Sequence, residues 1–210
     1  MKQIDFLKQH CEFNNPYDCY VLLAVSRKKD TPEITNSQEI VFREVIKNEK
    51  DITRKYLKIK TMCESYQDEN GKKYPFYIYI SLNARDSLRA TFQLMYKINL
   101  WSEEVIRGVD RSQFFKKVYG HFYSTLMHKS AKSRHTKYFM FDLDDKEKIN
   151  EVLEELGYEV VLSQETKNGY HIKTKAFDTR SVIEKFKKLN IDIELKRDAN
   201  FFVEYIKNEM

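Results

Sequence analysis

The sequence predicts an α+β protein in which a mixed α/β front lobe, residues 1–137, packs on a split-βαβ back lobe, residues 138–210. In the back lobe, short apolar runs and amphipathic segments follow the order β-α-β-β-α-β. The chain of 210 residues is 41% hydrophobic and 14% aromatic, with only five Gly and three Pro, which is typical of an ordered globule with a sizeable core. We expect the two lobes to form one compact unit.

Strand signals dominate the front lobe. Long apolar runs predict buried strands, and shorter alternating runs predict partly exposed ones. A polar stretch with a single glycine predicts a turn, and two periodic segments predict helices. The predicted elements are buried strands at 18–26 and 76–82, shorter strands at 40–46 and 56–62, a turn at 67–73, and helices at 87–96 and 102–106.

The back lobe is more regular. Its apolar runs are separated by turn signals, among them Gly157 at a helix C-cap position and the hairpin sequence Lys167-Asn168-Gly169. These signals predict the RRM-like, or split-βαβ, order of elements. The predicted strands are 138–143, 159–164 and 170–175, the helices are 146–156 and 179–189, and residues 191–195 and 201–206 supply the closing strand or strands.

Two carboxylates stand two residues apart at the end of the first back-lobe strand, at Asp142 and Asp144. Residues i and i+2 of a strand point to the same face, so these side chains would lie side by side. Adjacent carboxylates repel each other unless a cation lies between them, and hard oxygen ligands suit Mg²⁺ or Mn²⁺. A turn or helix-capping role for Asp144 and Asp145 is the alternative.

His171 follows the predicted hairpin on the third back-lobe strand. In a split-βαβ sheet the first and third strands are central neighbours, so Asp142, Asp144 and His171 would share one open face. Binding modules of this fold usually present aromatic residues there to stack bases. Acids at these positions favour catalysis over simple RNA binding, although a strand histidine bonded to backbone is the alternative for His171.

These residues resemble a known family. An apolar strand that ends in Asp-x-Asp, here Asp142-Leu-Asp144, followed by Gly169-Tyr-His171 on the next strand but one, is similar to the catalytic core of the archaeo-eukaryotic primase superfamily. The resemblance covers about the last third of the chain. It departs from the family at Thr166-Lys167, where the common Ser-Gly-x-Gly-x-His motif has Ser-Gly.

The resemblance implies a set of catalytic residues. Asp142 and Asp144 match metal ligands, and His171 matches the histidine that contacts the phosphates of the incoming nucleotide. Asp198 is favoured over Asp192 and Glu194 as the third acid and metal ligand. The implied catalytic residues are Asp142, Asp144, Asp198 and His171, and the implied nucleotide-binding residues are His171, Lys167, Asn168 and Lys137.

Positive charge is concentrated in the front lobe. Residues 1–137 hold 25 basic and 16 acidic residues, whereas residues 138–210 hold 12 and 16. The stretch 111–137 has seven Lys or Arg and no acid. Its last ten residues lack apolar periodicity and predict either a phosphate-binding loop or a solvated linker. With the strand-to-helix corner that begins at 83, this stretch supplies the predicted nucleic-acid-binding residues: Arg85, Arg89, Lys129, Lys132 and Arg134.

Aromatic residues are interleaved with this positive charge. They recur at helical spacing, so we expect them to form a stripe that faces the core. The residues of this stripe are Phe115, Tyr119, Phe122 and Tyr123.

Cysteine use and hydropathy limit the class of protein. Cys11, Cys19 and Cys63 are widely spaced and form no Cys-x-x-Cys pair, so neither a zinc site nor a disulfide framework is expected. No apolar run approaches the length of a membrane span, and the first residues lack the apolar stretch of a signal peptide. We therefore expect a cytoplasmic protein.

The predicted function is metal-dependent nucleotidyl transfer, like that of a minimal DNA primase or primase-polymerase that synthesises or extends primers on single-stranded nucleic acid. Mg²⁺ or Mn²⁺ and an NTP or dNTP are implied, and a replication helicase or another protein is the expected partner, in a phage or mobile element. Two alternatives are a catalytically inactive nucleic-acid-binding module of the same fold and a metal-dependent nuclease.

Overall fold

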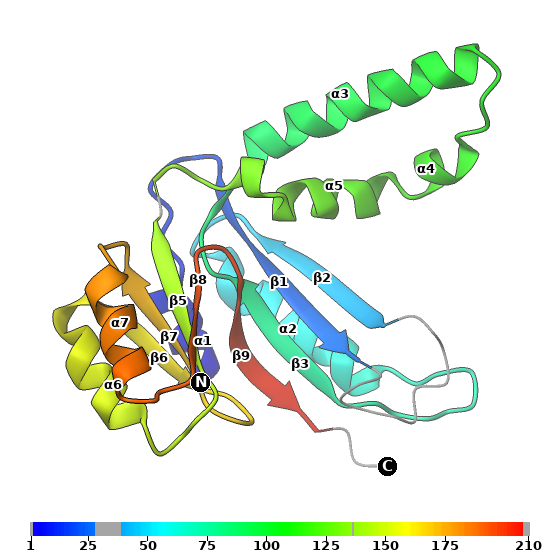
Figure 1. Cartoon of the computed structure of the whole chain (residues 1–210). Helices are drawn as coiled ribbons and strands as arrows, with labels where there is room; N and C mark the ends of the chain where they lie inside the picture. The colour runs from blue at the N-terminus through cyan, green and yellow to red at the C-terminus, as the bar shows by residue number, and fades with distance from the viewer. Residues whose placement is uncertain (1, 28–38, 136, 208–210) are drawn as a thin grey trace.

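The computed structural model describes residues 2–27, 39–135 and 137–207. They form a mixed α+β protein with two antiparallel sheets and a helical hairpin that projects away from both (Figure 1). No helix among the described residues combines the length and hydropathy needed to cross a membrane.

The first sheet has the strand order β2-β1-β3-β9, and the short strand β4 pairs with β1. Alternate residues of β1, including Tyr20 and Leu22, are buried in the main core with residues of α1 and α2. This part of the chain comprises α1 (Lys2–His10), β1 (Asp18–Ser26), β2 (Ile40–Ile46), α2 (Asp51–Ser65), β3 (Phe76–Ser81), β4 (Arg85–Asp86) and β9 (Asn200–Ile206).

The strand predicted at 56–62 is wrong, because these residues lie within α2. The buried positions Ile52, Tyr56, Ile59 and Cys63 are spaced by four, three and four residues. That spacing places them on one side of a helix. The short alternation within 56–62 is part of this longer helical pattern.

The helical hairpin consists of α3 (Ser87–Ile106), α4 (Ser112–Lys116) and α5 (Val118–Met127). The two helices predicted within 87–106 are parts of the single helix α3. Phe122 and Tyr123 pack at the base of the hairpin with residues of β1, as the predicted stripe requires. Phe115 and Tyr119 are instead exposed, at 40% and 84%, because the hairpin extends beyond the sheet that would cover them (Figure 1).

The second sheet has the order β6-β7-β5-β8 and carries α6 and α7 on one face (Figure 1). Phe141 of β5 and Ile172 of β7 are buried there with Phe186 of α7. The elements are β5 (Tyr138–Leu143), α6 (Ile149–Leu156), β6 (Val160–Glu165), β7 (Tyr170–Lys175), α7 (Arg180–Lys188) and β8 (Ile193–Lys196).

The hairpin between β6 and β7 lies against the end of β5. The Thr166 N–H donates to the Gly169 carbonyl at 2.8 Å, and the Gly169 N–H donates to Thr166 Oγ1 at 3.1 Å. A Cβ at Gly169 would come within 1.7 Å of the Leu143 carbonyl oxygen. Only glycine therefore fits this position, and the close approach holds the hairpin beside the end of β5.

The chain crosses from the second sheet to the first at residues 197–199. β8 pairs with β5 in the second sheet, whereas β9 pairs with β3 in the first, so the last strand leaves the predicted back lobe. Asp198 accepts from both terminal nitrogens of Arg85, at 3.0 and 2.7 Å. The Leu82 N–H donates to the Ala199 carbonyl at 2.9 Å. These bonds attach the crossing to the first sheet.

We expect Asp198→Asn to lower the free energy of unfolding by roughly 2 kcal/mol or more, because the buried Arg85 guanidinium loses its charged partner. Denaturant unfolding measures the change. Asp192→Asn removes the same charge from an exposed position and serves as the control. Equal stability of Asp198→Asn and the wild type would contradict this role for the pair.

Candidate functional site

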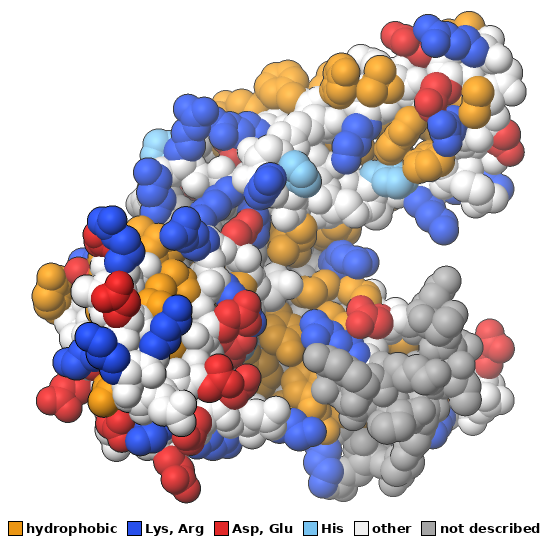
Figure 2. Space-filling model, viewed as in Figure 1, with side chains coloured by type: hydrophobic (Ala, Val, Ile, Leu, Met, Phe, Trp, Pro, Cys, Tyr) orange, Lys and Arg blue, Asp and Glu red, His pale blue; other side chains and the backbone are white. Residues whose placement is uncertain are grey.

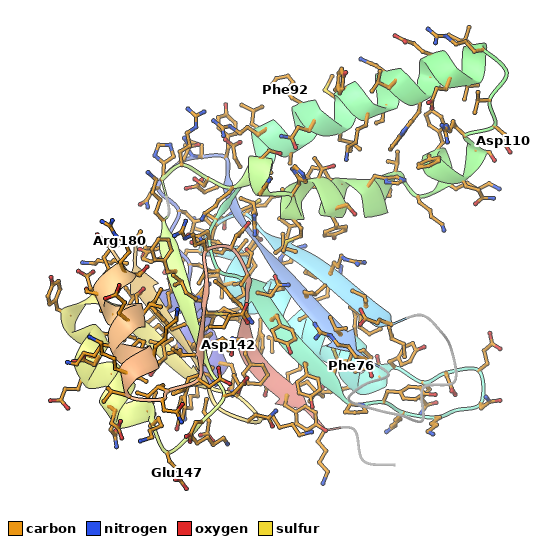
Figure 3. All side chains as sticks on the ribbon, viewed as in Figure 1. Phe76, Phe92, Asp110, Asp142, Glu147 and Arg180 are labelled. Carbon is orange, nitrogen blue, oxygen red and sulfur yellow. The ribbon has the colours of Figure 1, made fainter. Side chains whose placement is uncertain are left out.

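A predicted acid and the predicted imidazole meet on the face of the second sheet opposite α6 and α7. Asp142 and His171 are directly paired across β5 and β7, and His171 Nε2 lies 3.3 Å from Asp142 Oδ1. In Figure 3 the labelled Asp142 lies between the second sheet and β9. The structure thus brings together two residues that are far apart in the sequence.

The tautomer of His171 follows from its two hydrogen-bonding neighbours. The Phe202 N–H of β9 donates to His171 Nδ1 at 3.0 Å, so Nδ1 carries no proton. Nε2 then carries the proton and donates to Asp142. The ring is therefore neutral and held on both sides, by one strand from each sheet. A backbone partner of this kind was the alternative for His171, and it coexists with the contact to the acid.

Asp142 also binds a cation from its own sheet. Lys196 Nζ lies 2.5 Å from Asp142 Oδ2 and 3.0 Å from Glu194 Oε2. Burial alone would raise the pKa of Asp142, but the hydrogen bonds from His171 and Lys196 outweigh it and lower the pKa to about 2. Asp142 is thus a carboxylate whose charge is compensated within the protein.

A cavity of about 190 Å³ opens beside these residues, between the two sheets. Asp142, Asp144 and His171 line one side, together with the β6–β7 hairpin. The other side consists of aromatic and basic residues from the first sheet and the end of β1. The remaining lining residues are Thr166, Lys167 and Asn168 of the hairpin, and Arg27, Tyr77, Tyr79 and Phe202.

A larger cavity of about 610 Å³ adjoins the first, because four residues, from the hairpin and the first sheet, line both. Aromatic rings gather where the cavities meet: Tyr77 and Tyr205 have centroids 4.8 Å apart, and Tyr79 and Phe202 have centroids 5.9 Å apart. The acids therefore stand at one end of a groove that contains aromatic side chains. Such rings can stack on nucleic-acid bases. The shared residues are Tyr77, Thr166, Lys167 and Phe202.

Asp142 and Asp144 are the residues that could hold a divalent cation, if substrate oxygens completed its coordination. Asp142 and Asp144 line the same cavity, and Mg²⁺ commonly binds one or two carboxylates plus substrate phosphates and water. Among the described residues, no three His, Cys, Asp or Glu side chains are arranged to hold a metal by themselves. A cation that takes both oxygens of Asp142 would also have to displace Lys196.

The candidate third acids lie in different places. Asp198, the one favoured from the sequence, is bound to Arg85 at the crossing and does not line the cavity. Glu194 is directly paired with Asp142 across β8 and β5. Residues paired in this way point to the same face of a sheet. Asp192 precedes β8 and is exposed. The register therefore favours Glu194 over Asp198 as the acid nearest the pair.

The predicted nucleotide-binding residues are divided between two sites. Lys167 and Asn168 line the cavity with the acids, whereas Lys137 lines a separate cavity at the start of β5. Lys137 would therefore not act on the same ligand group as His171.

Two of the predicted nucleic-acid-binding residues already have partners near the strand-to-helix corner. The Arg85 side chain is 1% exposed and bound to Asp198, so it has no surface on which to meet a strand. Arg89 Nε lies 3.3 Å from Asp86 Oδ2. Arg85 is thus committed to the fold, whereas the Arg89 side chain is 37% exposed.

The other three predicted nucleic-acid-binding residues follow the helical hairpin. Lys132 Nζ donates to the Arg197 carbonyl at 2.8 Å. Lys129 and Arg134 are exposed to solvent. Of the predicted set, these two side chains are therefore the ones best placed to meet a strand.

One cation of the site was not predicted, although strand alternation indicates it. Lys196 is separated by one residue from Glu194 on β8, so both side chains point to the face that carries Asp142. This alternation can be read from the sequence, but it points to Asp142 only when β8 is known to pair with β5.

The aromatic side of the site was also not predicted. Tyr77 and Tyr79 alternate with buried residues of β3, and this pattern indicates that the tyrosines point away from the core. The contribution of Phe202 depends on the crossing to the first sheet, for which the sequence carries no local signal.

The chain matches no protein-family model, and no curated protein or solved structure is significantly similar to it. The function is therefore inferred from the residues and their geometry.

The low pKa of Asp142 predicts a specific loss of stability in acid. Its folded pKa, about 2, lies below its ordinary value of 3.8. The stabilisation is therefore present above pH 3.8 and is lost as the pH falls toward 2. We expect the difference in free energy of unfolding between the wild type and Asp142→Asn to decrease by roughly 1 to 2 kcal/mol over this range, since solvent screens part of the interaction. Denaturant unfolding at a series of pH values measures it, and a difference that does not change with pH would contradict the ion-pair assignment.

Proposed function

We propose that this protein is a metal-dependent nucleotidyltransferase, similar to a minimal primase or primase-polymerase, that acts on single-stranded nucleic acid. The observation that carries the proposal is the cavity shared by Asp142, Asp144 and His171 at the end of an aromatic groove. A nucleoside triphosphate would suit one end of the groove, where carboxylates, an imidazole and groups that can donate hydrogen bonds to phosphate lie together. Aromatic rings next to them suit bases.

The order of elements supports a primase-like interpretation of the second sheet and its helices. Residues 138–196 follow the order β-α-β-β-α-β, and the strands are arranged as β6-β7-β5-β8. This is the arrangement expected of a split-βαβ unit. In this interpretation the first and third strands of the unit, β5 and β7, carry Asp142 and His171 in the centre of the sheet, and Asp144 follows the end of β5.

Each group at the site has a role in this proposal. Asp142 and Asp144 would hold Mg²⁺ or Mn²⁺, and a bound ion would supply activation of the attacking hydroxyl and compensation of charge on the triphosphate. His171 would donate a hydrogen bond from Nε2 to a phosphate oxygen instead of to Asp142, and the Phe202 N–H keeps the ring in this tautomer. Lys167 donates to the outer phosphates. The reaction depends mainly on positioning and charge compensation.

The partners in this proposal are a single-stranded template and an NTP or dNTP. Arg27 lines the cavity just beyond the end of β1 and supplies positive charge opposite the acids. A replication helicase or another protein would supply the unwound template.

A specific observation favours a second candidate function, binding of nucleic acid without catalysis. Lys196 already compensates the charge of Asp142, at 2.5 Å, so this acid need not repel a phosphate backbone. In that case the ion pair would be permanent, and the groove would serve for stacking and phosphate contacts alone.

An incorporation assay distinguishes these functions. The full chain is incubated with a primed or unprimed single-stranded template, labelled NTPs or dNTPs, and Mn²⁺ or Mg²⁺. We expect product with the wild type, and a decrease of about 100-fold or more with Asp142→Asn or Asp144→Asn, because each loses a charged metal ligand. Gel analysis of the labelled strands measures the product.

The matched control is Glu154→Gln, which removes one negative charge from an exposed position on α6. It should leave incorporation unchanged. Template binding without any incorporation would support the binding module and contradict the enzyme. Shortening of the template without incorporation would instead indicate a nuclease.

The register of β5 and β8 leads to a separate prediction about the third acid. We expect Glu194→Gln to reduce incorporation by about 10-fold or more, because Glu194 lies directly opposite Asp142. Asp192→Asn, which changes the exposed acid just before β8, should reduce it little. Thermal unfolding of both variants checks that neither change acts through stability. Full activity of Glu194→Gln, or a loss confined to Asp192→Asn, would overturn the assignment of Glu194.

A further inference from the structure

Another cavity, of about 430 Å³, lies at the start of β5. Four of the residues that line it are basic, and none of the seven is acidic. Figure 2 shows Lys and Arg side chains gathered where the helical hairpin meets the second sheet and its helices. The lining residues are Lys132, Ser133, Arg134, Lys137, Phe139, Ala176 and Arg197.

This cavity is distinct from the site of Asp142. Phe139 and Asp142 are three residues apart on β5, so they point to opposite faces of the second sheet. Phe139 shares its face with Phe141, which packs against Phe186 of α7. None of the seven residues that line this cavity lines the cavity of Asp142.

An aromatic ring and a guanidinium group lie together in the cavity. Arg197 Cζ lies 5.8 Å from the centroid of the Phe139 ring, within the range of a cation–π contact. The Lys132 ammonium donates to the Arg197 carbonyl at 2.8 Å, and the next residue, Asp198, is bound by Arg85. The chain around Arg197 is thus held at two points, by Lys132 at its carbonyl and by Arg85 at the next residue.

The charge of the cavity is positive because its charged lining residues are all basic, and the carboxylate next to Arg197 in the sequence is already paired. Asp198 forms its bidentate bond with the buried Arg85 and so offers little negative charge to the cavity. Arg134 and Lys137 are exposed and can reach a ligand phosphate from solvent. An aromatic ring with cations around it is the combination that binds a base and its phosphates.

We propose that this cavity binds one nucleotide unit of a single strand of nucleic acid. The base stacks on Phe139 beside Arg197, and the flanking phosphates contact Arg134 and Lys137. A stacked base shows only its ring face, so binding is largely independent of sequence. The proposal deepens the strand binding proposed above, but it does not depend on catalysis, because the cavity faces away from Asp142.

The test measures binding of a fluorescein-labelled oligothymidylate to the full chain by anisotropy, with EDTA present so that no metal-dependent step contributes. Phe139→Leu should bind about tenfold more weakly, because a stacking surface is lost. Arg134→Gln/Lys137→Gln should also bind more weakly, and the slope of log K against log salt should become shallower by about 1.4, as expected for two lost phosphate contacts.

Lys187→Gln/Lys188→Gln removes the same charge from exposed positions on α7 and is the matched control. An equal change of slope in this control would overturn the proposal, as would unchanged binding by both cavity variants. Since Arg134 and Lys137 are exposed, their substitution tests the cavity even if Phe139→Leu does not fold.

Two further measurements distinguish the ligand source and the site. Thymidine monophosphate added as a competitor should displace the strand only weakly, whereas displacement at equal concentration would assign the cavity to free nucleotides and overturn binding of a strand. The cavity substitutions should weaken strand binding equally when they are made in the Asp142→Asn variant. Loss of these effects in that background would show that the strand is bound at the other site.

Discussion

The crossing of the chain from the second sheet to the first, at residues 197–199, is the feature on which both candidate sites depend. Asp198 binds Arg85 there, and β9 then pairs with β3. This path brings the Phe202 N–H to His171 and sets aromatic residues of the first sheet against the acids of the second. It also carries Arg197 to the cavity at the start of β5. One ion pair and one strand pairing therefore organise sites on two faces of a sheet.

The second sheet could be predicted closely from the sequence, because its signals are local. Apolar runs, Gly157 and the hairpin at 167–169 identify each element within a few residues, and the central position of β5 and β7 then places Asp142 beside His171. The partner of Asp198 could not be predicted in this way, because Arg85 is 113 positions distant and no periodicity links the two. The strand signal at 56–62 was misleading because only two of the four buried positions of α2, Tyr56 and Ile59, fall within that window.

Electrostatics at Asp142 separates the two proposed functions. The carboxylate is bonded by a neutral imidazole and by an ammonium group, so the protein compensates its charge with its own side chains. In the proposed enzyme, a divalent cation would have to bind Asp142 more strongly than Lys196 does, and the oxygens of a triphosphate would help to hold the cation there. Metal and nucleotide would then bind most strongly together. If Lys196 remains bound to Asp142, the same residues would form a surface that does not repel phosphate and has no catalytic role.

The pairing of β9 with β3 has a consequence for how the chain acquires its structure. Residues 76–81 of β3 pair with residues 200–206 of β9, so the first sheet is completed by contacts between residues that are far apart in the sequence. Such contacts are slow to form, since a long loop has to close first. The second sheet is built from residues 138–196 alone. We therefore expect the second sheet to form early, and the first sheet to be completed after it.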